Sequence, residues 1–454
     1  MTIQSSIISL LFLLLLPVAA TFSIPTERDR LTMSASSSSS SSARNIVVIG
    51  GGIQGSAVAY YLSQSKHWPT NSQITILESE TLASAASGKG GGFMARSWGD
   101  GTATQKLHEL SFDLFESLAT ELPLDSYRRL PVLSVQPGTR PVQRGKVSEA
   151  VAQVLPNWLD GSTGSISMLG SGVNTAQVTP QEVTTKFVEK SGANVCYGTA
   201  IGISTVPCNN DDRQVTGVIY APRDSEAPQT LPCDTAVVCA GPWSCIAEDW
   251  FPGAVKLPME GVKSTSIVWK APPTTAARGS GDVDATALFC GEDHRFGTHL
   301  EVYPRPDNTI YLCGIGGSDY IDSEQLKAGA FRSECSAKPS RVEAAKAAFT
   351  EMSAQYKING ELDRVQACMR PCPPDTLPYM GSIPGYRGAY INAGHNCWGI
   401  AWSAGCGAAM SELILQGKCN CVDLTPFDPT RFCPKSSRGT RGRKKGTLNV
   451  GEQW

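Results

Sequence analysis

The sequence is poor in charged and aromatic residues. Of its 454 residues only 18% are charged and 7% are aromatic, and 39 Lys+Arg nearly balance 41 Asp+Glu. The formal net charge of −2 excludes a chain that binds nucleic acid through an overall positive surface. A hydrophobic content of 41% excludes a largely disordered chain. We therefore expect two or three folded domains, since a domain takes about 150 residues.

The cysteines lack the paired C-x-x-C spacing that indicates a zinc site. There are fifteen of them, and Cys419 and Cys421 stand alone near the end of the chain. Others lie in apolar, strand-like runs, where a free thiol behaves as a small hydrophobic group. We therefore predict no metal site, and buried thiols rather than a disulfide framework.

No apolar run reaches the ~20 residues of a membrane-spanning helix. The one at residues 7–20 is shorter and ends in the small residues Val18–Ala20, as in a secretory signal, although no Lys or Arg precedes it. We predict a signal-like leader (1–20), a disordered Ser-rich linker or transit segment (21–43) and a basic disordered tail (434–454). Such a leader predicts the ER or secretory route, or a complex plastid, with no integral membrane span after its removal. An uncleaved anchor is the alternative.

The first motif that carries chemistry is a glycine-rich turn. Ile46–Ile49 is a β-branched run that predicts a buried parallel strand, and G-x-G-x-x-G and a helical pattern follow it. In this motif Gly50 permits the tight turn, Gly52 leaves room for a pyrophosphate and Gly55 lets helix and strand pack closely. The N–H groups at the helix N-terminus then face the phosphates. The sequence thus predicts a dinucleotide site.

The next strand supports the same site. Residues 74–77 lead into Glu78, 23 residues after Gly55, where a carboxylate accepts both ribose hydroxyls and disfavours a 2′-phosphate. This argues against NADP. Residues 83–93 are small and glycine-rich, which suits a backbone threaded along an extended cofactor, with Ser87 and Lys89 as candidates for phosphate contacts. A flexible surface loop is the alternative. The first motif alone leaves NAD and FAD open.

Motifs along the whole folded region resemble the FAD oxidoreductases of the D-amino-acid oxidase, glycine oxidase and sarcosine oxidase superfamily. Besides the glycine-rich turn, they lie at 177–200, 215–220, 236–244, 368–381, 390–400 and 424–432. Glu301–Pro306, E-V-Y-P-R-P, resembles a little-characterised eukaryotic subgroup.

The resemblance implies an α/β fold with FAD as cofactor. A Rossmann-type FAD-binding domain with a parallel sheet would take 44–122, 173–256 and 362–433. A substrate domain with a mixed or antiparallel sheet would take 123–172 and 257–361. We expect residues 104–122 to form a packing helix with His108 at the surface. The motifs and the resemblance together predict these FAD contacts: Gly50, Gly52, Ile53, Gln54, Gly55, Glu78, Ser87, Lys89, Gly91, Gly92, Phe93, Ala200, Gly241, Trp243, Gly394, His395, Trp398, Gly399 and Ile400.

The resemblance also implies oxidation of the C–N bond of an amino acid or related amine. Hydride would pass from the substrate Cα to flavin N5, with O2 or an unknown carrier as the electron acceptor. Arg370 occupies the family's position for the arginine that binds the substrate carboxylate, with a structural ion pair as the alternative. Tyr303, Arg305 and Tyr379 are weaker pocket candidates. The rival hypothesis is a non-catalytic flavoprotein that keeps FAD as a structural core for an interaction role.

Cys368 carries a separate hypothesis. Sarcosine-oxidase-type members join a cysteine to the flavin 8α carbon in a similar segment, and Cys368 stands seven residues before Asp375, as theirs precedes an Asp. The attacking species is a thiolate, which Arg370 would favour if it faces the ring. Since Arg370 replaces the aromatic residue of those members, we expect a buried apolar cysteine, with a covalent link as the alternative.

Overall fold

The structure is a computed structural model that describes residues 42–272 and 283–434. These residues belong to one unit of the chain, Ser42–Trp454. The predicted leader, nearly all of the linker and the basic tail lie outside the described residues, so they and the localisation stay predictions. No helix within the described ranges is both long and apolar enough to cross a membrane.

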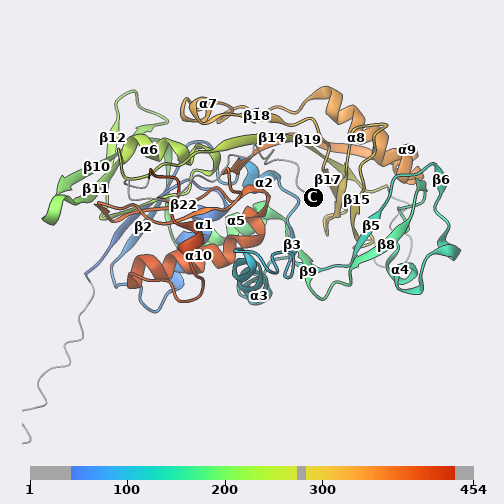
Figure 1. Cartoon of the computed structure of the whole chain (residues 1–454), viewed down its shortest axis with the longest axis horizontal. Helices are drawn as coiled ribbons and strands as arrows, with labels where there is room; N and C mark the ends of the chain where they lie inside the picture. The colour runs from blue at the N-terminus through green and yellow to red at the C-terminus, as the bar shows by residue number, and fades with distance from the viewer. Residues whose placement is uncertain (1–41, 273–282, 435–454) are drawn as a thin grey trace, which may run out of the picture. The chain divides into compact units, whose positions relative to one another are not determined.

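The first of two large sheets has nine strands and a parallel centre. Its central strand, β1 (Asn45–Ile49), pairs in parallel with β2 (Gln73–Glu78) and β13 (Thr235–Val238). The run 46–49 is buried, as predicted for a central parallel strand. Outside these lie β10 (Asn194–Pro207), β11 (Arg213–Pro222), β12 (Gln229–Pro232), β20 (Tyr379–Ser382), β21 (Tyr386–Arg387) and β22 (Ala389–Ala393). Figure 1 labels five strands of this sheet, β2, β10, β11, β12 and β22, on the left.

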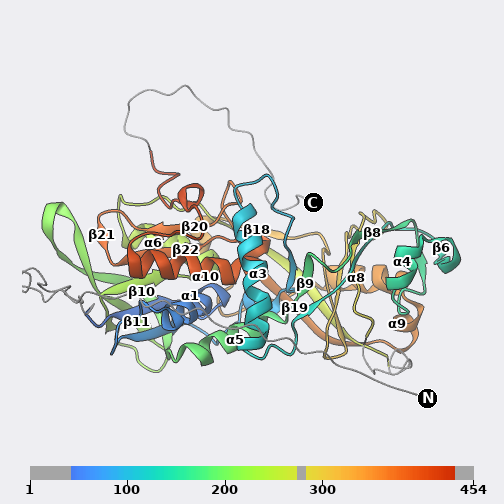
Figure 2. The ribbon, with the colours of Figure 1, turned by 90° about the horizontal axis from the view of Figure 1, so that it is seen from below.

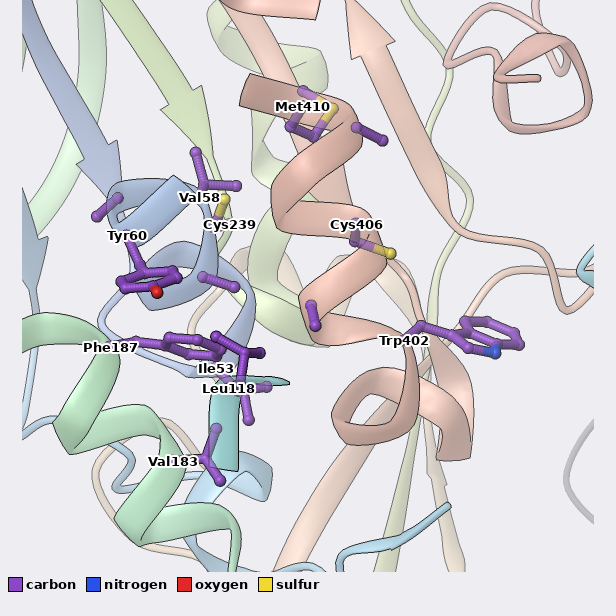
Figure 3. Close-up of a cluster of buried hydrophobic side chains, with 14 of the residues drawn as sticks. Ile53, Val58, Tyr60, Leu118, Val183, Phe187, Cys239, Trp402, Cys406 and Met410 are labelled. Atoms are coloured by element: carbon purple, nitrogen blue, oxygen red, sulfur yellow. The ribbon is translucent and has the colours of Figure 1, made fainter. Parts of the chain in front are cut away.

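One face of this sheet packs against a group of helices. Their apolar side chains form one core with alternate residues of β1 and β2, part of which Figure 3 shows. The glycine at position 407 lets two of the helices approach closely, since a Cβ there would lie 2.8 Å from the Ala57 carbonyl oxygen. Figure 2 shows α3 beside α10. These helices are α1 (Ile53–Gln64), α3 (Gln105–Glu121), α5 (Pro180–Ser191) and α10 (Gly399–Gln416).

The second large sheet has eight strands and is mixed. Its pairs are antiparallel except for one, between β5 (Val132–Val135) and β15 (Ala287–Cys290). A separate apolar core lies between this sheet and the helices α4 (Glu149–Val154), α8 (Pro339–Met352) and α9 (Ala354–Asn359). The other strands are β8 (Ile166–Gly170), β14 (Glu260–Lys270), β16 (Glu301–Pro304), β17 (Thr309–Cys313), β18 (Asp319–Ile321) and β19 (Glu361–Cys372).

One predicted boundary differs from the structure. We expected residues 362–433 to lie with the first sheet, but β19 pairs with β14 along most of its length and belongs to the second. The alternation of side chains along 361–372 predicts a half-buried strand without indicating its partner. The predicted α/β class with a mixed second sheet is confirmed, and the remaining domain bounds stay predictions.

The smaller elements complete the described chain. They are α2 (Ala86–Lys89), α6 (Ala247–Trp250), α7 (Ser323–Lys327), β3 (Phe93–Ala95), β4 (Arg128–Arg129), β6 (Arg140–Pro141), β7 (Ser162–Thr163), β9 (Thr175–Gln177) and the 3-10 turns η2 (Arg144–Lys146), η3 (Asn209–Asp211), η4 (Gly241–Ile246), η6 (Asn396–Trp398) and η7 (Thr425–Phe427).

Candidate functional site

A cavity of about 330 Å³ is lined by residues of both large sheets. Most of the predicted site residues line it, although they come from distant parts of the chain. They are Gly50, Gly52, Ile53, Gln54, Glu78, Ser87, Gly91, Gly92, Phe93, Ala200, Tyr303, Gly241, Trp243, Cys368, Arg370, Gly394, His395, Trp398, Gly399 and Ile400. The position of each in this lining does not by itself assign its role.

The glycine-rich turn forms one end of the cavity. Gly50 has a φ of +113°, and a Cβ there would lie 2.5 Å from the Cys239 carbonyl oxygen, so the bend needs glycine. A Cβ at Gly52 would lie 2.9 Å from the Ser87 hydroxyl and would fill the space that the turn leaves open. The Ser87 hydroxyl also accepts the N–H of Ile53, at 2.9 Å. Because position 52 has no side chain, the backbone at the start of α1 stays open to the cavity. The N–H groups at a helix N-terminus favour an anionic group there.

Glu78 closes the turn from the end of β2. One carboxylate oxygen accepts the N–H of Gly51 at 2.7 Å, and the other accepts the N–H of Glu80 at 2.8 Å. The side chain is buried and lines the cavity. A carboxylate oxygen can accept more than one hydrogen bond, so Glu78 can shape the loop and still receive ribose hydroxyls.

The N-terminus of α10 meets that of α1 at the same cavity. The Gln54 side chain donates to the Gly399 carbonyl at 2.6 Å and accepts from the Asn392 amide at 3.0 Å. Both helix starts therefore present their N–H groups to one space, as a cofactor with phosphates and an electron-rich ring requires.

Two buried polar atoms beside these helix starts have no hydrogen-bond partner among the described residues. They are Oδ1 of Asn392 and Nε2 of His395, and both residues line the cavity. Burial lowers the pKa of His395 to about 3, so its ring is neutral at physiological pH. Unpaired buried polar atoms are costly, and the polar edge of a flavin ring would supply the partners that they lack.

Arg370 and Glu301 place a cation and a carboxylate in the same cavity. Burial lowers the pKa of Arg370, but Cys397, Cys372, Cys368 and Glu301 raise it, and the net shift is upward. Glu301 on β16 accepts hydrogen bonds from the Tyr303 hydroxyl and, at 3.4 Å, from the Cys313 thiol. Both Arg370 and Glu301 line the cavity. The sequence does not single out Glu301, because the E-V-Y-P-R-P pattern indicates only a strand and a family subgroup.

Aromatic rings form the cavity wall next to Glu301. Phe93 stacks on Tyr303 with ring centroids 5.6 Å apart, and Phe289 contacts both rings edge-on. Trp98 packs against Phe93 and Phe289. These rings give the cavity an apolar surface beside Glu301, and electrostatic interactions are stronger next to apolar groups than in water.

Four of the predicted site residues do not line the cavity. Lys89 donates to the Ala367 carbonyl at 3.1 Å, because α2 packs against β19, and this contact does not support the phosphate role. Arg305 is buried under Tyr311 and donates to the Gly90 carbonyl at 3.0 Å, so it supports the loop. Tyr379 is fully buried, and its hydroxyl donates a hydrogen bond to the Pro258 carbonyl at 2.8 Å. Gly55 lies against the Gly50 carbonyl, consistent with its packing role.

His108 was predicted at the surface, and this was wrong. Its ring is buried, with Nδ1 3.0 Å from the Ala95 carbonyl oxygen, and it packs against Trp398 and Trp402. Periodicity placed it on α3 correctly, but α10 covers the face that carries it.

Cys368 lines the cavity, but its environment opposes a thiolate. Burial and the neighbouring Cys335 raise its pKa, Arg370 and Lys89 lower it, and the net value is about 11. This agrees with a small apolar residue more than with a nucleophile. The covalent link to flavin stays a prediction.

Comparison with known proteins identifies the family. Residues 45–413 match the DAO family, described as FAD dependent oxidoreductase. The chain belongs to the DAO family of FAD-dependent oxidoreductases. FAD is accordingly its cofactor, and the glycine turn, Glu78 and the unpaired atoms of Asn392 and His395 fit that group.

Individual relatives agree with this family. The chain is 28% identical over 410 residues to "Putative oxidoreductase C1F5.03c" of Schizosaccharomyces pombe, covering 85% of this chain and 97% of that protein. Glycine oxidase from Geobacillus kaustophilus superposes with a TM-score of 0.64 at 17% identity, over 86% of this chain and all of its own. L-proline dehydrogenase from P. horikoshii superposes with a TM-score of 0.64 at 19% identity, over 86% of this chain and 98% of its own. At these identities the two solved structures show a shared fold.

Proposed function

We propose that the protein oxidises the C–N bond of an amino acid or a closely related amine. The observation that carries the proposal is the presence of Arg370 and Glu301 in the same cavity that the FAD motifs line. An amino acid is a zwitterion, so a site that offers it the Arg370 guanidinium and the Glu301 carboxylate is complementary to it. The names of the two solved structures, which both refer to amino acids, support the same class.

Arg370 binds the substrate carboxylate in this proposal. Its half-buried side chain lines the cavity, and its pKa is shifted upward, so the guanidinium stays charged. A planar guanidinium can hold both carboxylate oxygens at once, which orients the Cα–H as well as binding the substrate. The positive charge of Arg370 is partly balanced by Glu301, so an added carboxylate must compete for it.

Glu301 binds the substrate ammonium and accepts its proton. Its Oε2 already accepts hydrogen bonds from the Tyr303 hydroxyl and the Cys313 thiol, whereas its Oε1 accepts no hydrogen bond from the described residues. A substrate ammonium on Oε1 would lose one proton to the carboxylate, leaving the nitrogen lone pair that assists departure of the Cα hydrogen. When bound, FAD supplies the hydride acceptor for that hydrogen.

A panel of amino acids and amines tests the proposal directly. The purified holoprotein is mixed anaerobically with each compound, and the flavin absorbance is followed. We expect bleaching by at least one compound that carries both an amine and a carboxylate. If every compound leaves the flavin oxidised, the non-catalytic alternative is supported instead. Rapid recovery of colour in air would indicate O2 as the acceptor, and slow recovery a separate electron carrier.

A further inference from the structure

We infer that Cys419, Cys421 and Glu412 form a binding site for a thiophilic divalent cation of the Zn²⁺ class. The site lies at the C-terminal end of α10, whose N-terminus lines the FAD cavity. Those ends are roughly 27 Å apart for an 18-residue helix. The proposal is therefore independent of the oxidation proposed above.

The two sulfur atoms are already at a metal-binding separation. Sγ of Cys419 and Sγ of Cys421 lie 3.6 Å apart. Two thiolates at about 2.3 Å from a tetrahedral Zn²⁺ are roughly 3.8 Å apart, whereas a disulfide needs about 2.0 Å. One ligand atom from each of the three residues lies within 4.8 Å of the others. The observed geometry is closer to a chelate than to a disulfide.

The chain holds these ligands together by local contacts. Gly417 ends α10 in the left-handed conformation, with a φ of +74°, and turns the chain back. Oε2 of Glu412, in the last turns of the helix, accepts the N–H of Asn420 at 2.6 Å and that of Cys421 at 3.2 Å. Its Oε1 accepts no hydrogen bond from the described residues and is available to an ion.

The ligand types agree with this arrangement. Cysteine sulfur and carboxylate oxygen are both ligands that Zn²⁺ takes in proteins, and the soft thiolates favour Zn²⁺ over Mg²⁺ or Ca²⁺. Binding releases the thiol protons to solvent, and three protein ligands leave a fourth position for water.

A buried hydroxyl nearby has no partner. The Tyr61 phenol makes no hydrogen bond within the described part of the chain. The Ser411 hydroxyl, next to Glu412 in the sequence, donates to the Tyr61 carbonyl at 3.0 Å, so Tyr61 packs beside this end of α10. From there a phenol can donate to a ligand of the ion or to the water on it. Such outer contacts are typical of metal sites.

The test is metal binding by the reduced holoprotein. After equilibration with dilute Zn²⁺, metal is quantified per chain, and Co²⁺ is titrated while absorbance is followed in the red, where oxidised flavin does not absorb. We expect one ion per chain and tetrahedral Co²⁺ bands. Cys419→Ser and Cys421→Ser should each weaken binding more than about 100-fold, and Glu412→Gln by about 10-fold. Cys208→Ser, at another half-buried cysteine, is the matched control, and flavin absorbance reports correct folding.

Three results would overturn the inference. They are no ion above background, equal binding by the wild type and both serine variants, and a Cys419–Cys421 disulfide in protein isolated under reducing conditions. None of them depends on finding a substrate, so failure here is distinguishable from failure of the proposed oxidation.

Discussion

At the residue scale, the proposed binding of an amino acid depends on the charges of Arg370 and Glu301. We predict that Arg370→Ala keeps FAD bound and raises KM for the substrate, with a loss of about 2–5 kcal/mol in binding, typical of one member of a desolvated charge pair. Arg370→Lys should recover part of this loss, because it restores the charge without the planar fork. Steady-state kinetics of both variants measure the effect. Normal oxidation by Arg370→Ala would contradict the role.

Glu301→Gln should change the pH dependence of turnover. The amide keeps the size of the side chain but cannot take a proton from the substrate ammonium. We expect a loss of about 10²–10⁴ in kcat/KM near neutral pH. The loss should shrink at alkaline pH, where the free amine is already neutral. Glu324→Gln, on exposed α7, is the control. If the pH profile of kcat/KM runs parallel to that of the wild type, Glu301 does not take the proton and its role is structural.

Buried His395 should make the fold sensitive to acid. Burial depresses its pKa to about 3 in the folded state, whereas an unfolded histidine titrates near 6.5. Below about pH 6.5 the unfolded state binds a proton that the folded state does not. Stability therefore falls with decreasing pH by up to about 1.4 kcal/mol per pH unit until the folded pKa is reached. In thermal unfolding, His395→Asn should flatten this decline between pH 6 and 4, and His67→Asn, at an exposed histidine, should not.

Sequence spacing predicted one half of the site better than the other. Gly50, Gly52 and Glu78 sit on consecutive elements, and a strand–turn–helix dictates their positions. Glu301 was missed because β16 and β19 are not neighbours in the second sheet, so its proximity to Arg370 depends on the sheet's arrangement. The sequence does not show a third metal ligand beside Cys419 and Cys421, because Glu412 approaches them only after the chain reverses at Gly417.

At the element scale, the position of both helix starts depends on how closely α1 and α10 pack. The apolar periodicity predicted both helices, but it did not predict that small residues let them approach this closely. A Cβ at Gly407 would lie 2.8 Å from the Ala57 carbonyl oxygen and 2.8 Å from the Tyr61 ring. The Gln54 hydrogen bond to Gly399 depends on this approach.

We predict that Gly407→Val separates these two helices. Overpacking of this kind typically costs about 1–3 kcal/mol, and the shift should also weaken FAD binding by disturbing the start of α10. Ala408→Val is the matched control. That position is partly exposed, so the substitution should lower stability mainly through helix propensity, by less than about 1 kcal/mol. Thermal unfolding and flavin release measure the difference. Equal effects of the two variants would show that close packing at position 407 is unimportant.

At the scale of the whole molecule, the FAD site joins segments that are far apart in sequence. Its lining runs from Ile49 to Ile400 and includes strands of both large sheets. A ligand that binds the folded state in this way stabilises every segment that it contacts, because unfolding must release it. The sequence predicted most of the lining on the first sheet from motifs, and little of the lining on the second.

Removal of FAD should therefore lower the stability of the whole described fold. We predict one FAD per chain. Free FAD at 100 times Kd should raise the free energy of unfolding by about 2.7 kcal/mol, and the unfolding temperature should rise with it. Gly52→Leu should be colourless and unfold at the temperature of the apoprotein, because its side chain would fill the space beside Ser87. Gly145→Leu, where a Cβ meets nothing within 4 Å, should remain yellow and respond to FAD as the wild type does. A Gly52→Leu protein that keeps its colour would place the pyrophosphate elsewhere and require a different orientation of FAD in the cavity.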